Sequence, residues 1–151
     1  MRTLLMRERL PDRRRSWTQK VNIGGHKVYL CVGEYEDGRP GEIFVDISKE
    51  GTFLRGVMDA WARTASIALQ CGADIEVIIH AVEELCFIPD GEVKGSSYVT
   101  ECTSIIDWVA QELKAKYTSC SKPTTNIGEG DVSPLKEKVA GHISESWRVG
   151  A

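Results

Sequence analysis

The sequence lacks the features that mark several classes of protein. No apolar run approaches the ~18 residues that a membrane-spanning helix needs. The first residues, 1–7, hold no apolar stretch of signal-peptide length, so we expect a cytoplasmic protein without a membrane partner. Neither a P-loop nor a dinucleotide-binding glycine fingerprint occurs. With 151 residues, of which 42% are hydrophobic, the chain has the length and composition of about one globular domain.

Paired metal ligands are also missing. The five cysteines, at positions 31, 71, 86, 102 and 120, form no Cys-x-x-Cys pair, and the three histidines fall in no ligand spacing. We therefore expect no metal site. An odd number of cysteines is typical of reduced thiols, and we interpret each one as a small buried hydrophobic residue.

Positive charge is scarce outside the first twenty residues. Those twenty hold seven basic and two acidic side chains, whereas the other 131 residues carry 12 basic and 20 acidic ones. A basic arm on an acidic body can bind phosphates, or it can dock on the body of its own chain or of a neighbouring one. General nucleic-acid binding is not expected, because the body offers no basic surface.

Alternating apolar residues predict three antiparallel strands. The first two, Trp17–Ile23 and His26–Tyr35, are separated by Gly24-Gly25, which can adopt the positive φ angles of a tight hairpin turn. A third run, Glu42–Ile47, follows a stretch rich in turn-forming residues. Together the three runs indicate a meander.

The apolar period then changes to three and four residues, which predicts helices. The first begins near Thr52 and ends before Gly72, and the second begins after Asp74 and carries its apolar face to Leu85. A loop or short hairpin precedes a third helix, from about Glu101 to Tyr117. The fold class is α+β: an antiparallel β-meander followed by three helices packed on one face of the sheet.

The chain divides into a basic N-terminal arm (1–16), an α+β domain (17–117) and a polar tether (118–151). Within the tether, Ser133-Pro134 is typical of a helix start, and apolar residues then recur every four positions. Two interpretations stay open for 134–147: a short docking helix or part of a largely disordered tail.

No set of residues indicates nucleophilic or acid–base catalysis, but two features favour binding. In the first, the small residues of Gly91–Ser97 precede the third helix, where backbone N–H groups suit a phosphate. Phe87 can stack on a base or pack in the core. In the second, Arg13-Arg14-Arg15 with Trp17 can clasp a phosphate and a ring, or form salt bridges to the acidic body.

These features combine into a predicted site for a nucleotide-type anion between the loop, the third helix and arginines from the arm or from Arg55. The arginines can come from a neighbouring subunit, and we expect a homo-oligomer because so short a chain covers its sheet poorly. The predicted ligand-binding residues are Arg13, Arg14, Arg15, Trp17, Arg55, Phe87, Gly91, Gly95, Ser96, Ser97 and Thr103.

Several motifs resemble one known family, the TSCPD-type domain that follows the catalytic barrel in adenosylcobalamin-dependent (class II) ribonucleotide reductases. The resemblance extends in order from Arg7 to Tyr117. The motifs that carry it are Arg7–Lys20, Gly33–Asp46, Lys49-Glu50-Gly51, Ser66–Gly72, Phe87–Gly91 and Thr103–Trp108.

The sequence also departs from that family. A barrel with its thiyl cysteine and cobalamin site has no room here, and only Cys120 stands where many full-length enzymes carry a tail with paired cysteines. Glu101-Cys102-Thr103-Ser104 replaces the full Thr-Ser-Cys-Pro-Asp signature. The resemblance therefore implies a fold and a nucleotide-related role. It implies no catalysis by this chain alone, and adenosylcobalamin would belong to a separate catalytic subunit.

Two functions remain open. The chain is either a free-standing accessory domain of cobalamin-dependent ribonucleoside-diphosphate reduction, working with a separate reductase catalytic subunit, or a non-catalytic nucleotide-binding protein. In the second case it would sequester cyclic or ADP-ribose-type signalling nucleotides, as a viral anti-defence protein does.

Overall fold

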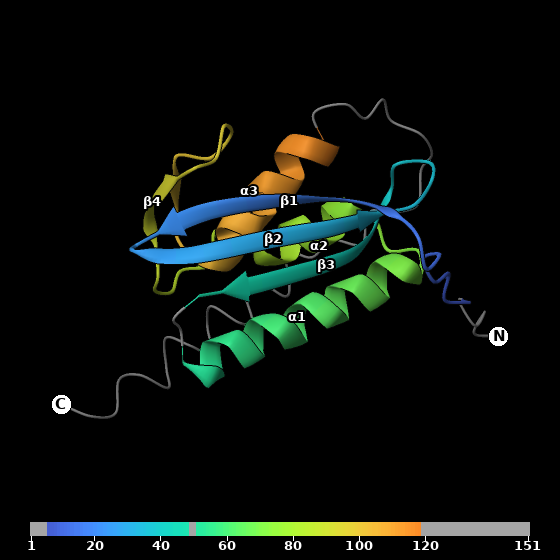
Figure 1. Ribbon diagram of the computed structural model, residues 1–151, viewed down its shortest axis with the longest axis horizontal. Helices are drawn as coiled ribbons and strands as arrows, with labels where there is room; N and C mark the ends of the chain where they lie inside the picture. Colours follow the sequence, from blue (N-terminus) through green and yellow to red (C-terminus); the bar gives the residue numbers. More distant parts are fainter. Residues whose placement is uncertain (1–5, 49–50, 119–151) are drawn as a thin grey trace. The chain divides into compact units, whose positions relative to one another are not determined.

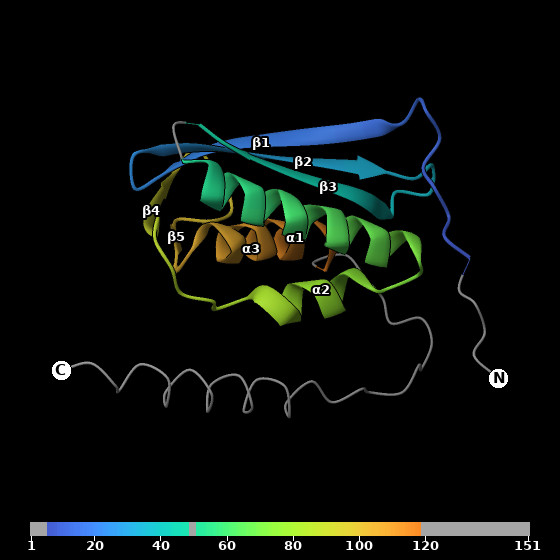
Figure 2. The same cartoon turned by 90° about the horizontal axis from the view of Figure 1, so that it is seen from below.

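The computed structural model describes residues 6–48 and 51–118 as five strands and three helices. The strands form one antiparallel sheet in the order β3-β2-β1-β4-β5 (Figure 1). Figure 2 shows all three helices on one side of this sheet, with α2 farther from the strands than α1 and α3. The predicted α+β class is confirmed. The elements are β1 (Arg15–Ile23), β2 (His26–Glu34), β3 (Pro40–Ile47), α1 (Thr52–Gln70), α2 (Ile75–Val82), β4 (Gly91–Lys94), β5 (Glu101–Cys102) and α3 (Ile105–Tyr117).

The hairpin between β1 and β2 turns at Gly24 and Gly25, as predicted. Their φ angles are +56° and +87°, which residues with a side chain rarely adopt. A turn of two residues fixes the register of the strands, so Ile23 pairs with His26 and Arg15 pairs with Glu34. This register places the basic start of β1 beside the acidic end of β2.

The core lies between the sheet and the helices. Alternate residues of the strands point inward, and Ile23, Leu30 and Ile47 are fully buried. Trp108 of α3 is also fully buried and belongs to the same apolar cluster. One face of the sheet is therefore covered by helices, in agreement with the alternation in the sequence.

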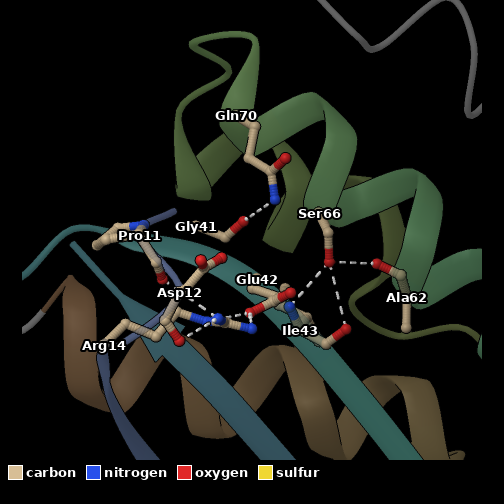
Figure 3. A network of polar contacts seen from close by, with 9 residues as sticks. All are labelled: Pro11, Asp12, Arg14, Gly41, Glu42, Ile43, Ala62, Ser66 and Gln70. Atoms are coloured by element: carbon tan, nitrogen blue, oxygen red, sulfur yellow. Dashed lines mark hydrogen bonds and ion pairs between the residues drawn. The ribbon is translucent and has the colours of Figure 1, made fainter. Parts of the chain in front are cut away.

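Helix α1 closes the outer edge of β3 with polar side chains (Figure 3). The Ser66 hydroxyl accepts a hydrogen bond from the Ile43 N–H at 2.8 Å, and Gln70 Nε2 donates to the Gly41 carbonyl at 2.8 Å. An uncovered edge strand offers such groups to other chains. The Ile43 N–H and the Gly41 carbonyl, which could otherwise pair with the strand of another chain, are therefore hydrogen-bonded within this chain.

The ends of α1 and the start of α2 agree with the sequence. Gly72 has a φ of +92°, its N–H donates to the Leu69 carbonyl, and the Ala73 N–H donates to the Ala68 carbonyl, which is a Schellman motif. Asp74 caps α2 by accepting from the Glu76 N–H. The predicted extension of α2 to Leu85 is wrong, because the helix ends at Val82.

The start of the third helix was predicted too early. Helix α3 begins at Ile105 after the N-cap Ser104, whose hydroxyl accepts from the Asp107 N–H. Glu101-Cys102 forms the short strand β5 instead, and it pairs with Gly91-Glu92 of β4. The segment 87–97, predicted as a loop or short hairpin, supplies only the strand β4. Its partner lies in the segment predicted as helix, because pairing with β4 draws residues 101–102 into the sheet.

The tether from residue 119 onward, with the segment 134–147, lies outside the described residues. Among the described helices, no helix is long and apolar enough to cross a membrane.

Candidate functional site

The N-terminal arm is fastened to the body where β2 ends and β3 begins. The Glu8 N–H donates to the Gln70 carbonyl at 2.8 Å, and the Tyr35 hydroxyl donates to the Glu8 carbonyl at 2.5 Å. Gly41 permits this packing, because a Cβ atom there would lie 2.5 Å from Tyr35 Cε2 and 2.7 Å from Leu10 Cδ1. From Glu8 onward, the arm therefore has a defined course over the body.

Arg14 holds the end of the arm against the sheet (Figure 3). Its Nε donates to Glu42 Oε2 at 2.6 Å, and its Nη1 lies 3.3 Å from the carbonyl oxygens of Pro11 and Asp12. For this arginine, the predicted alternative of a salt bridge to the acidic body is confirmed. Arg14 is thus committed to an ion pair that is partly shielded from water.

The two neighbouring arginines are less engaged. Arg15 Nη2 donates weakly to the Glu36 carbonyl at 3.3 Å, and Arg13 makes no hydrogen bond or ion pair with any described residue. All three arginines line an open hollow of about 410 Å³, and Arg13 and Arg14 also line a second one of about 330 Å³. The first hollow is lined by Pro11, Arg13, Arg14, Arg15, Glu34, Tyr35 and Glu36.

Trp17 is turned away from this hollow and toward α3. Its Nε1 donates to the Tyr117 hydroxyl at 2.8 Å, which donates in turn to Glu34 Oε1 at 2.7 Å. Lys116 Nζ lies 4.8 Å from the centre of the indole ring. Burial raises the pKa of Tyr117, and its position beside Glu34 raises it further. Trp17 is therefore not among the residues that line the hollow, and it is linked to Glu34, which does line it, through Tyr117.

The predicted phosphate loop is built differently from the expectation. Gly91 belongs to strand β4, and the Gly95 carbonyl accepts from Gln19 Nε2 at 2.7 Å. The Ser96 hydroxyl donates to the buried Glu112 and accepts from the N–H groups of residues 98 and 99. Ser97 is exposed. The hydroxyl and these two N–H groups are thus used within the fold.

The start of α3 carries its own anion. Asp107 is 5% exposed, and its carboxylate accepts from the Glu84 N–H at 2.8 Å, the Thr103 N–H at 3.1 Å and Gln111 Nε2 at 2.8 Å. Burial alone would raise the pKa of Asp107, but these hydrogen bonds outweigh it and hold the pKa below its ordinary value. The Thr103 hydroxyl donates to the Leu85 carbonyl. A protein carboxylate therefore occupies the position in which we expected a phosphate.

The predicted residues do not converge in one chain. Arg55 donates to the Ile47 carbonyl of β3, and strands β2 and β1 separate β3 from β4. Strand β4 pairs with Asn22 and Ile23, seven residues along β1 from Arg15, which is roughly 20 Å in an extended strand. Phe87 is 37% exposed, so its ring is neither in the core nor fully open. Only Arg13, Arg14 and Arg15 share a hollow.

Sequence reasoning missed Glu34, Tyr35 and Glu36 as neighbours of the arginines. The signal was present, because a two-residue turn at Gly24-Gly25 fixes the register that sets Arg15 opposite Glu34. Counting outward from the turn would have found these residues.

The cysteines follow the prediction in part. Cys102 is buried, and burial raises the pKa of its thiol to about 11, so it is a small hydrophobic residue as expected. Cys86 is exposed, so for that residue the prediction is wrong. Cys31 and Cys71 are half-buried. Across residues 6–48 and 51–118, no group of three His, Cys, Asp or Glu side chains is placed to hold a metal ion.

The described residues form an α+β domain, and the N-terminal arm is hydrogen-bonded to the body of that domain. Residues 5–117 match the family model of the TSCPD domain, so the chain belongs to the TSCPD domain family. The family resemblance predicted from the sequence is confirmed.

The chain is homologous to part of proteins named vitamin B12-dependent ribonucleotide reductase. It is 46% identical to the one from Bradyrhizobium diazoefficiens over 120 residues, 78% of this chain and 10% of that protein. The identity is also 46% with the protein from Agrobacterium fabrum, over 74% of this chain and 9% of that protein. With the protein from Rhodopirellula baltica it is 42%, over 75% and 11%. The chain thus spans about a tenth of these relatives, and no solved structure matches it.

Proposed function

We propose that this chain is an accessory domain of vitamin B12-dependent ribonucleotide reduction that works with a catalytic polypeptide. The observation that carries this proposal is the 46% identity to a reductase over 120 residues. The family model covers residues 5–117, which include the arm from residue 5 onward as well as the sheet and helices. In this chain the arm is fastened to the body near Tyr35, Gly41 and Gln70, which supports a unit that the arm completes.

The second part of the proposal is that the arm binds the phosphates of a nucleotide. A hollow of about 410 Å³ has the size of a small-ligand site, for which ~300–1,000 Å³ is usual. Arg13 supplies a guanidinium without a described partner, and Arg14 is held in place by Glu42. A guanidinium fork binds phosphate oxygens in pairs, which gives both affinity and orientation.

Adenosylcobalamin does not fit the hollow beside the three arginines. At about 410 Å³ this hollow is open and has the size of a site for a much smaller molecule than a corrin with its nucleotide arm. We therefore assign the cofactor to the catalytic polypeptide. This chain's own part is docking and nucleotide binding.

The docking proposal is tested with the Bradyrhizobium diazoefficiens reductase from which the matching segment has been deleted. We expect the purified chain, added in trans, to bind that protein and to restore part of its reduction of ribonucleoside diphosphates. The chain alone, with adenosylcobalamin and a dithiol, should give no turnover above a protein-free control. Failure to bind and to restore activity, with the truncated reductase shown to be folded, would contradict the proposal.

The nucleotide proposal is tested by melting the chain with ADP, CDP, ADP-ribose and cyclic AMP. A ligand that binds only the folded chain stabilises it by about 2.7 kcal/mol at one hundred times its dissociation constant. We expect ADP and CDP to raise the melting temperature most. If only ADP-ribose or cyclic AMP did so, the sequestration of signalling nucleotides would replace the accessory role.

A further inference from the structure

Helix α1 presents a second apolar stripe on the side turned away from the sheet. We define the α1 stripe as Phe53, Val57, Ala60, Thr64 and Ile67. All five are exposed, and the exposed fractions of Phe53, Val57 and Ile67 are 83%, 48% and 45%. Their spacing alternates between four and three residues, the pattern of a helix that packs along another helix. Figure 1 shows α1 along the outer side of β3.

The opposite side of α1 is already occupied. Met58, Ala62, Ala65 and Leu69 are buried in the core, and Ser66 binds the edge of β3. A surface helix of a globular protein usually has one apolar stripe and a polar far side. The α1 stripe is therefore an additional apolar surface, which marks an interaction site.

We propose that the α1 stripe pairs with the same stripe of a second copy of this chain, with the two helices antiparallel. A two-fold axis near Ala60 sets the bulky Phe53–Val57 end of one copy against the Thr64–Ile67 end of the other. The small Ala60 in the middle lets the two helices approach closely. Antiparallel helices also oppose their dipoles favourably, whereas parallel ones would not.

The charges beside the stripe favour this arrangement. Asp59 and Arg63 form an ion pair at 2.9 Å on one flank of α1. They lie on either side of the middle of the stripe, so the two-fold axis brings Asp59 of each copy alongside Arg63 of the other. Arg55, the remaining charge on α1, is engaged by the Ile47 carbonyl and by Asp46 of β3. Like charges therefore do not oppose the pairing.

The size of the stripe sets the expected strength. Residues 53–67 span about 21 Å of helix. One pair of helices in contact over so short a length buries less surface than a standard stable interface, which covers ~1,600 Å². We therefore expect a reversible dimer that forms at micromolar concentrations. This inference does not rest on the proposed role in ribonucleotide reduction.

The experiment is sedimentation velocity of the full chain from about 1 to 500 μM, a range that brackets a micromolar dissociation constant. We expect the average mass to rise from the 16.8 kDa monomer toward twice that value. Val57→Asp should abolish the rise, and Ala60→Arg should do so independently. The matched control is Val77→Asp on α2, because Val77 is 56% exposed and lies outside the stripe.

Circular dichroism and melting confirm that each variant is folded. A wild-type chain that stays monomeric at every concentration overturns the proposal. So does a dimer that survives both Val57→Asp and Ala60→Arg. If the wild type is monomeric and Val57→Asp instead impairs binding to the truncated reductase, the stripe is a docking surface for the catalytic polypeptide, and pairing between copies is refuted.

Discussion

The N-terminal arm and the start of α3 both carry residue types that suit an anion, yet they differ in how those groups are used. At the start of α3 and in the loop before β5, the hydroxyl groups of Thr103 and Ser96 are hydrogen-bonded within the chain. In the arm, Arg13 lines two hollows without a described partner. A binding site therefore depends on donors that remain available after folding, and residue type alone does not reveal which ones those are.

Asp107 explains most of the difference. Its carboxylate fills the positive end of α3 and ties Glu84 and Thr103 to the helix. At the arm, Glu42 pairs with Arg14, and none of the described carboxylates pairs with Arg13, although Glu34 and Glu36 line the same hollow. The first region is therefore a structural anchor, and the second is a candidate site.

The largest effect is expected when the anchor is removed. Asp107→Ala leaves the N–H groups of Glu84 and Thr103 without an acceptor, which should lower the free energy of unfolding by about 3 kcal/mol. Urea unfolding measures this loss. Asp59→Ala, which removes a half-exposed carboxylate of α1, is the control and should cost less than about 0.5 kcal/mol. Equal losses in the two variants would refute the anchor.

The same anchor predicts a pH dependence. Because the folded-state pKa of Asp107 lies below its ordinary value of 3.8, its contribution is fully present above that value and is lost as pH falls below it. The wild type should therefore lose more stability than Asp107→Asn between pH 5 and pH 3 (about one unit either side of an ordinary aspartate pKa). Parallel curves for the two proteins would contradict this account.

A smaller loss is expected where the arm is fastened. Gly41→Ala places a methyl group against the Tyr35 ring, which is itself held by Glu8, so we expect a cost of about 2 kcal/mol. Faster proteolysis of the arm should accompany it. Gly56→Ala is the matched control, because nothing lies within 4 Å of its added Cβ, and it should stabilise α1 slightly.

Trp17→Phe should have a lesser effect still. The change removes the hydrogen bond from Nε1 to the Tyr117 hydroxyl, worth about 1 kcal/mol. Thermal unfolding detects the loss. Because Trp17 acts through Tyr117 and Glu34, nucleotide affinity should change less than it does when Arg13 is substituted. A larger change in affinity than that would show that the indole touches the ligand.

Much of the fold could be predicted because its signals are local. Gly24-Gly25 sets the hairpin, and Gly72 and Asp74 mark helix ends by their backbone preferences. The start of α3 and strand β5 could not be predicted. Pairing with β4, nine to eleven residues earlier in the chain, decides whether Glu101-Cys102 is helix or strand, and the residues 101–102 do not signal this pairing by themselves.

Only part of the candidate site could be predicted, because the rest depends on contacts between separate segments of the chain. The arginines are visible as a run, but their neighbours come from the end of β2, and the sequence alone does not show that Arg14 is paired while Arg13 is not. The pair Ser104 and Asp107, three residues apart, is a helix-capping signal in the sequence, but the prediction placed the helix start near Glu101 and so missed it.

The central claim is that nucleotide phosphate binds at the arm, and calorimetric titration of ADP tests it most directly. Arg13→Ala should weaken binding about tenfold or more, as expected for a lost charge-assisted contact, while unfolding changes by less than about 0.5 kcal/mol. Phe87→Ala, at the other region, should leave the affinity unchanged. Unaltered binding by Arg13→Ala together with a loss in Phe87→Ala would contradict the account.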